Sequence, residues 1–232
     1  MGKNKLHRFN ENNTFPNLIQ PDISEVFKDD YLLKGGWSKN YFQNTNPIVI
    51  ELGCGKGEYT VGLANKFSEK NFIGIDIKGA RLWRGAKTAF ENRMKNVAFI
   101  RTRIEFIASF FGGNEVDEIW LTFPDPQPKW IRAKKRLTSS RFLNMYKTFL
   151  KPDGLVHLKT DSQELHRYTL QLIQKNNLRI IHQTQDLYNS NLSDDILSIK
   201  TFYESQYLEQ GLNITYLCFN LNHEGEIEEP FS

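Results

Sequence analysis

Short apolar runs alternate along the chain with longer segments of mixed polarity. Five runs rich in β-branched and aromatic residues occupy 47–52, 71–77, 96–102, 116–123 and 154–160. The segments between them are long enough for helices, and 138–150 carries apolar residues at helical spacing. This alternation is typical of βαβ units and predicts a parallel sheet covered by helices.

The two ends of the chain depart from this alternation. Residues 1–46 are polar and rich in asparagine, with Pro16, Pro21 and a Gly35-Gly36 pair. They predict a partly flexible N-terminal arm with one short helix near 22–33. Toward the other end, the runs 179–185 and 213–221 predict antiparallel strands at one edge of the sheet. Residues 47–232 are then expected to form a single domain.

Bulk composition narrows the class of protein. A chain of 232 residues is long enough for one sizeable α/β core. Cys54 and Cys218 cannot make a disulfide framework, and no apolar stretch has the length of a signal peptide's core or a membrane span. The five histidines show no metal-ligand spacing, so no metal is predicted. We expect a cytoplasmic protein.

Charge is distributed unevenly, although the net charge is only +3. Residues 78–103 hold eight Lys or Arg against one acid, and 129–136 hold five without any acid. In contrast, 185–232 hold nine acids against Lys200. The basic segments predict a surface that binds phosphates, as nucleic-acid binders have. The alternative is an ordinary solvated helix face.

A glycine-rich loop follows the first predicted strand in the sequence ELGCGKGEY, 51–59. Gly53, Gly55 and Gly57 permit a tight turn and close approach of a ligand, although a tight turn without any ligand would look the same. The second strand ends in Asp76, an acid that can accept both hydroxyls of a ribose. Glu51 would repel a pyrophosphate and suits the ammonium and sulfonium of S-adenosylmethionine, which favours this methyl donor over NAD.

The fourth predicted strand runs into the sequence LTFPDPQPKW, 121–130. Ligands of open α/β sheets bind beyond the carboxyl ends of the strands, so Asp125 is a candidate reacting group. Pro124 and Pro126 on either side of it predict a stiff, non-helical loop. The alternative is a turn aspartate that bonds only its own backbone.

Five blocks of sequence resemble, in order and spacing, the bacterial tRNA (guanine-N7)-methyltransferase family over about 48–221. The proline-aspartate-proline loop distinguishes this family, whereas all class I methyltransferases share the glycine loop. The resemblance implies a Rossmann-like class I fold with a mostly parallel seven-stranded sheet, helices on both faces and an antiparallel edge. The blocks are ELGCGKGEY (51–59), GIDIKGARLWRGAK (74–87), LTFPDPQPKW (121–130), HLKTD (157–161) and TFYE (201–204).

The resemblance also implies an activity: transfer of methyl from S-adenosyl-L-methionine to N7 of the variable-loop guanosine of tRNA, position 46. Asp125 matches the proposed catalytic residue. Glu51, Asp76 and Asp125 match the family's cofactor contacts, and Gly53, Gly55 and Arg103 are further candidates for the cofactor site. Matching substrate contacts are Lys129, Asp161, Thr201, Phe202, Tyr203 and Glu204. By their charge, Arg132, Lys134, Lys135 and Arg136 are candidates for RNA phosphates, and the N-terminal arm is a candidate RNA contact.

The chain departs from the family pattern at two places. After the third strand the family usually has an Asp or Asn that touches the adenine, and this chain has Arg103, whose backbone would have to supply the contact. Gln127-Pro128 replaces the Trp-His common after the loop, which bears on how the base is stacked.

Guanine N7 carries a lone pair and no proton, so catalysis should be mainly positioning. Asp125, sharing the task with Asp161, would accept hydrogen bonds from guanine N1–H and the exocyclic amine. Trp130, Tyr203 and Phe123 are candidates for stacking on the base or for the core. Two alternatives stay open: a methyltransferase for another nucleobase or a small molecule, and a non-catalytic tRNA-binding subunit. The partner would be tRNA, and the protein a monomer or homodimer.

Overall fold

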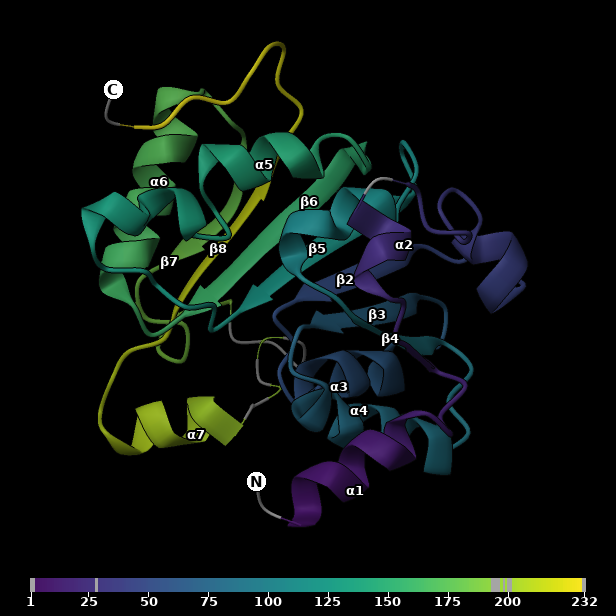
Figure 1. The fold of residues 1–232 in the computed structure, drawn as a ribbon. Coiled ribbons are helices and arrows are strands. Elements are labelled where there is room, and N and C mark those ends of the chain that lie inside the picture. Colours follow the sequence, from purple (N-terminus) through teal and green to yellow (C-terminus); the bar gives the residue numbers. More distant parts are fainter. Residues whose placement is uncertain (1–2, 28, 193–196, 198, 200–201, 231–232) are drawn as a thin grey trace. The chain divides into compact units, whose positions relative to one another are not determined.

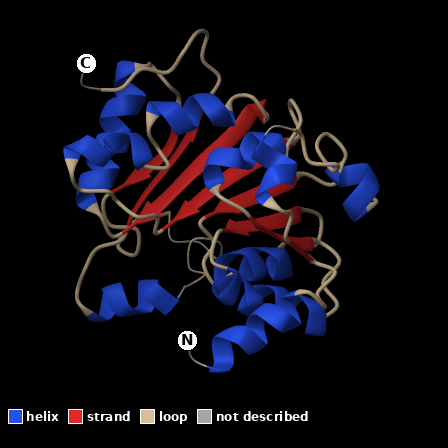
Figure 2. Cartoon of the chain, viewed as in Figure 1, coloured by secondary structure: helices blue, strands red, loops and turns tan. Residues whose placement is uncertain are grey.

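The structure is a computed structural model that describes residues 3–27, 29–192, 197, 199 and 202–230. The chain forms two compact units, Met1–Glu115 and Val116–Ser232. Figure 1 labels their elements and Figure 2 distinguishes helices from strands. Among the described residues, no helix has the length and apolar character needed to span a membrane.

The first unit is built on four parallel strands in the order β1-β4-β3-β2. Residues of β2 and β3 are all buried, which explains why these strands stand out as continuous apolar runs. The strands are β1 (Leu18–Ile19), β2 (Ile48–Leu52), β3 (Asn71–Asp76) and β4 (Val97–Arg101). The helices are α1 (Lys3–Asn12), α2 (Ile23–Phe27), η1 (Trp37–Phe42), α3 (Glu58–Lys66), α4 (Gly79–Glu91) and η2 (Ile104–Ser109).

Three glycines make room for one buried ring in the first unit. A Cβ atom on Gly57, Gly74 or Gly85 would lie 2.5, 2.6 or 2.7 Å from the ring of Phe99. Phe99 has no exposed surface. Gly57 precedes α3, Gly74 lies in β3 and Gly85 lies in α4. Because none of the three has a side chain, both helices can pack closely against the sheet around the ring. Phe99 therefore helps to fix the loop that precedes α3.

Much of the predicted arm packs against the first unit. The side chain of Asn12, at the end of α1, donates a hydrogen bond to the carbonyl of Gly79 at 2.9 Å. The indole of Trp37 is fully buried and donates to the carbonyl of Phe110 at 2.8 Å. The short helix expected near 22–33 is α2. The division into an arm and one domain stays a prediction.

The second unit has four strands in the order β5-β6-β8-β7. β5 and β6 are parallel, while β8 pairs antiparallel with both β6 and β7. The strands are β5 (Val116–Thr122), β6 (Leu150–Thr160), β7 (Ile180–Thr184) and β8 (Thr215–Asn220). The helices are η3 (Trp130–Lys135), α5 (Ser140–Tyr146), α6 (Gln163–Lys175) and α7 (Phe202–Glu209).

The predicted fold class is confirmed: the strand pairings are mostly parallel, and β7 and β8 supply the antiparallel edge. The expected number of seven strands was wrong, because the described residues form eight. The additional strand is β1, of two residues, which pairs with β4. A strand this short has no hydrophobic period of its own.

His166 lies buried in α6, and neither of its ring nitrogens has a hydrogen-bond partner among the described residues. Burial lowers the pKa of this imidazole, because it disfavours the charged form. The unfolded chain binds a proton at His166 near pH 6.5, and the folded chain does so only at lower pH. Stability should therefore fall as the pH drops through about 6.5.

We expect His166→Leu to flatten this pH dependence. Urea unfolding at pH 7.5 and at pH 5.5 would measure it, with exposed His182→Gln as the matched control. If His166→Leu and the control lose the same stability between pH 7.5 and pH 5.5, His166 is not the cause of the pH dependence.

Candidate functional site

The glycine loop joins β2 to α3 in a tight turn. The amides of Gly53 and Cys54 both donate to the carbonyl of Ile75, at 2.8 and 3.0 Å. Gly53, Gly55 and Gly57 have φ of +79°, +57° and +70°, a region that favours glycine. A Cβ atom on Gly55 would meet nothing within 4 Å. The backbone at Gly55 therefore faces open space, as a ligand-binding loop requires.

Asp76 ends β3 beside this loop. One of its carboxylate oxygens accepts a hydrogen bond from the Gly55 amide at 2.9 Å, and the other accepts from the Lys78 amide at 2.7 Å. Each carboxylate oxygen has two lone pairs, so these bonds leave acceptor capacity for a ligand's hydroxyls. Asp76 is thus tied to the glycine loop, and its role in binding a ribose stays a prediction.

Glu51 lies on β2 with 3% of its surface exposed. Its carboxylate accepts hydrogen bonds from the amide (2.9 Å) and the hydroxyl of Thr60, in the first turn of α3. A negative charge is stabilised at that end of a helix. Burial raises the pKa of the Cys54 thiol well above its usual range, and the charges of Glu51 and Asp76 raise it further. The loop is therefore a negative environment, which suits a cationic ligand.

Arg103 follows β4, next to Thr102, whose amide donates to the carbonyl of Asp76 at 3.2 Å. This bond brings the backbone near Arg103 to the end of β3. The arginine side chain itself is half-exposed and pairs with Glu105 at 3.5 Å. A cofactor contact through the backbone of Arg103 stays a prediction.

The loop after β5 is held in a strained conformation. Phe123 and Gln127 have φ of +48° and +45°, which is uncommon for residues other than glycine. Asp125 between them is exposed, and its carboxylate accepts a hydrogen bond from the Gln127 amide at 3.1 Å. The local turn considered as the alternative is therefore present. It uses one oxygen and leaves Asp125 facing solvent.

Arg136 supports this loop from beneath. Its Nε donates to the carbonyl of Pro126 at 3.2 Å, and its Nη2 to the carbonyl of Gln127 at 3.2 Å and to Glu164 at 2.9 Å. The guanidinium also lies 4.3 Å from the centroid of the Tyr168 ring. Arg136 is only 3% exposed, so it has no surface for an RNA phosphate and that prediction was wrong. Nothing in the sequence of the basic run indicates that Arg136 is buried while the cations before it are exposed.

We expect Arg136→Lys to loosen the loop, because a lysine ammonium cannot reproduce the planar guanidinium fork. The expected losses are about 1–3 kcal/mol of stability and about tenfold in turnover. Chemical denaturation and a methylation assay would measure them, with exposed Arg141→Lys as the matched control. A variant with the control's stability and turnover would contradict this role.

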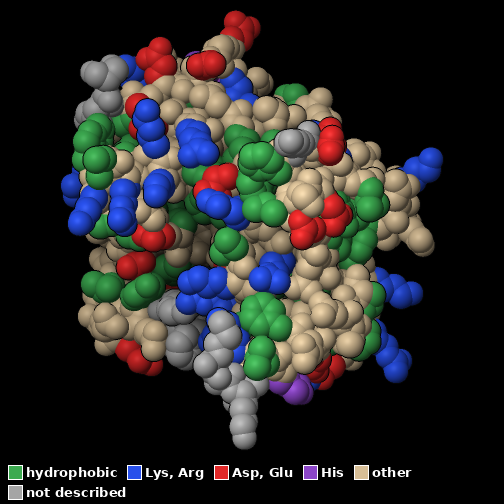
Figure 3. Space-filling model, viewed as in Figure 1, with side chains coloured by type: hydrophobic (Ala, Val, Ile, Leu, Met, Phe, Trp, Pro, Cys, Tyr) green, Lys and Arg blue, Asp and Glu red, His purple; other side chains and the backbone are tan. Residues whose placement is uncertain are grey.

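The other cations of the run are exposed along η3: Lys129, Arg132, Lys134 and Lys135. Trp130 and Ile131 are exposed with them, at 58% and 89%, so Trp130 is a surface residue rather than part of the core. Ala133 is the buried residue of the turn. Lysine and arginine side chains also gather on the face of the molecule seen in Figure 3.

The end of β6 carries a buried ion pair that the sequence did not predict. The ammonium of Lys159 lies 2.8 Å from the carboxylate of Glu204, and neither side chain is exposed. Lys159 also donates to the carbonyl of Leu197 at 2.5 Å, and the Tyr188 hydroxyl donates to Glu204 at 2.7 Å. Burial raises the pKa of nearby Asp161.

Of the other predicted substrate contacts, Thr201 lies outside the described residues. Phe202 and Tyr203 are described only as the first residues of α7. No cluster of three or more His, Cys, Asp or Glu suited to a metal occurs in the described part of the chain.

A family model described as "Putative methyltransferase" matches residues 45–217. A tRNA (guanine-N(7)-)-methyltransferase of Christiangramia forsetii is 57% identical, over 94% of this chain and 98% of its own length. One from Bacteroides thetaiotaomicron is 53% identical, over 99% and 90%.

The crystal structure of the 16S rRNA methyltransferase KamB superposes with a TM-score of 0.60 at 12% identity, over 78% of this chain and 91% of that one. This likeness shows the Rossmann-like fold of class I methyltransferases. A family model over most of the chain and relatives this similar over nearly its full length show that the chain belongs to the tRNA (guanine-N7)-methyltransferase family.

Proposed function

We propose that this protein transfers a methyl group from S-adenosyl-L-methionine to N7 of guanosine 46 in the variable loop of tRNA. The observation that carries the proposal is the name shared by relatives that match almost the whole chain, at up to 57% identity. The strained, exposed Asp125 loop supports it independently.

The residues of the first unit fit the donor. Gly55 leaves open space beside the backbone, Asp76 keeps acceptor capacity for the ribose hydroxyls, and Glu51 adds negative charge for the ammonium and sulfonium. Gly53 shapes the turn, and the Arg103 backbone would lie at the adenine. When bound, S-adenosyl-L-methionine supplies an electrophilic methyl group on a sulfonium and is left as a neutral thioether.

The guanine reacts through the N7 lone pair, which forms the new N–C bond while the electrons of the broken S–C bond stay on sulfur. No proton leaves N7, so no general base is required. The base gains positive charge, and Asp125 stabilises it while accepting hydrogen bonds from N1–H and the exocyclic amine. By resemblance, Asp161 would share this task.

The target base must leave its tertiary stack before it can react. Exposed Trp130 offers a surface for stacking, and the cations of η3 would hold phosphates: Lys129, Arg132, Lys134 and Lys135. Thr201, Phe202, Tyr203 and Glu204 stay proposed substrate contacts, by resemblance. We expect the enzyme to act in the cytoplasm, as a monomer or homodimer.

The test is incubation with labelled S-adenosyl-L-methionine and unmodified tRNA, followed by mapping of the label. We expect N7-methylguanosine at position 46, and no incorporation into a tRNA with adenosine at that position. Label on another nucleobase would favour the alternative methyltransferase. Tight tRNA binding without any label would favour a non-catalytic subunit.

A further inference from the structure

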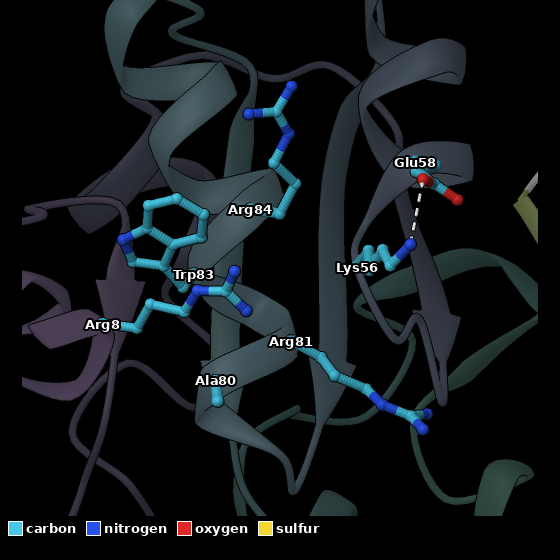
Figure 4. A pocket seen from close by; sticks show the side chains of 7 residues that line it. All are labelled: Arg8, Lys56, Glu58, Ala80, Arg81, Trp83 and Arg84. Carbon is cyan, nitrogen blue, oxygen red and sulfur yellow. Dashed lines mark ion pairs between the residues drawn. The ribbon is translucent and has the colours of Figure 1, made fainter. Parts of the chain in front are cut away.

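A pocket of about 440 Å³ opens on the first unit beside the glycine loop, which contributes Lys56 to its lining. Four segments line it: α1 through Arg8, the glycine loop through Lys56, α3 through its first residue, Glu58, and α4 through a group of four residues. Figure 4 shows these side chains around the pocket. The residues from α4 are Ala80, Arg81, Trp83 and Arg84.

The lining is strongly cationic. Four of the seven residues carry a positive charge, and one carries a carboxylate. That carboxylate, on Glu58, lies 4.0 Å from the ammonium of Lys56. Three of the cations are arginines, whose planar guanidinium matches the oxygens of a phosphate with two parallel hydrogen bonds. The pocket should therefore bind an anion. A phosphate group suits it better than a ligand that carries a positive charge of its own.

The N-terminal helix is fixed in place to complete this pocket. The indole of Trp83 donates to Glu11 at 2.6 Å, and the ammonium of Lys87 lies 2.7 Å from the same carboxylate. Asn17, which follows α1, is buried and donates to the carbonyl of Ala86 at 3.0 Å. Glu11 and Asn17 thus hold the C-terminal end of α1 and the segment after it against α4, one turn from Arg8.

The ring of Trp83 is already occupied by cations. The guanidinium of Arg8 lies 4.7 Å from its centroid, and the ammonium of Lys87 lies 5.1 Å away. Cation–π contacts of this kind orient the arginine. They also cover the ring, so a nucleobase gains little by stacking there. The pocket consequently suits a phosphate of a polynucleotide backbone better than a nucleobase.

We propose that this pocket binds a backbone phosphate of the RNA substrate, with Arg8, Arg81 and Arg84 as its ligands. The inference rests on the proposed function for the identity of the RNA. It gives the N-terminal helix a defined part in binding, through Arg8. A phosphate contact fixes the position of a nucleic acid without reading its sequence, so the pocket would orient tRNA rather than select the target guanosine.

The experiment compares the full-length protein with Arg81→Gln/Arg84→Gln and with Arg8→Gln, using unmodified tRNA at several salt concentrations. Exposed Lys39→Gln/Lys95→Gln, which removes two charges from the same unit outside the pocket, is the matched control. We expect the arginine double variant to bind tRNA at least about fivefold more weakly and to lower the salt dependence by about one ion per lost contact. Arg8→Gln should have a smaller effect in the same direction.

Thermal unfolding of each variant separates lost contacts from lost structure, and inorganic phosphate provides a second probe. If millimolar phosphate weakens tRNA binding to the wild type but not to the double variant, the pocket takes the phosphate group. If the folded double variant binds tRNA with the affinity and salt dependence of the control, the inference is overturned. A wild-type protein that binds tRNA but does not methylate N7 would instead overturn the proposed function and leave this comparison valid.

Discussion

Asp125→Asn should lower the rate of tRNA methylation by about 10²–10³-fold, the usual cost of removing one electrostatic contact to a developing charge. Asparagine keeps the oxygen that accepts the Gln127 amide, so the turn and the two prolines should hold their conformation. What is lost is the negative charge that stabilises the methylated, cationic guanine. The loss should appear in single-turnover rates at saturating donor and tRNA.

The matched control is Asp153→Asn, another exposed aspartate that follows a proline in the same unit. It should methylate at the wild-type rate. Calorimetric titration with the donor is a second readout, because the resemblance also makes Asp125 a cofactor contact. A single-turnover rate for Asp125→Asn within about threefold of the control would remove the charge from the mechanism.

The sequence predicted the parts of the fold that depend on a pattern within one short stretch of residues. Buried parallel strands such as β2 and β3 are continuous apolar runs, and a carboxylate at the end of a strand, such as Asp76, stands out from its position alone. β1 was missed because two residues have no period, and its pairing with β4 comes from the tertiary structure.

The sequence did not predict which charged side chains are buried. Arg136 ends a run of exposed cations, and nothing in that run distinguishes it from Lys135. It is buried because carbonyls of Pro126 and Gln127, and Glu164 from α6, meet its guanidinium. These partners come from a separate loop, 9 and 10 residues away, and from a helix 28 residues away, so a pattern within the basic run does not contain them. The buried partner of Glu204 was missed for the same reason.

Lys159→Met should be the most destabilising of the substitutions considered. It leaves the carboxylate of Glu204 fully buried without its ammonium partner. Removing one member of a buried ion pair typically costs about 3–5 kcal/mol. Urea unfolding followed by circular dichroism would measure the loss. Lys151→Met is the matched control on the same strand, because Lys151 and Asp117 form an ion pair whose two side chains stay partly exposed, and exposed pairs contribute about 0–1 kcal/mol.

The double variant Lys159→Met/Glu204→Leu separates the ion pair from the packing around it. Apolar side chains in place of both charges remove the cost of burying an unpaired carboxylate, so the double variant should be more stable than Lys159→Met alone. The double variant also tests Glu204 as a substrate contact. If it folds and binds tRNA like the wild type, the buried pair has a structural role only. If it is no more stable than the single variant, the stabilisation comes from contacts of Lys159 other than Glu204, such as the carbonyl of Leu197.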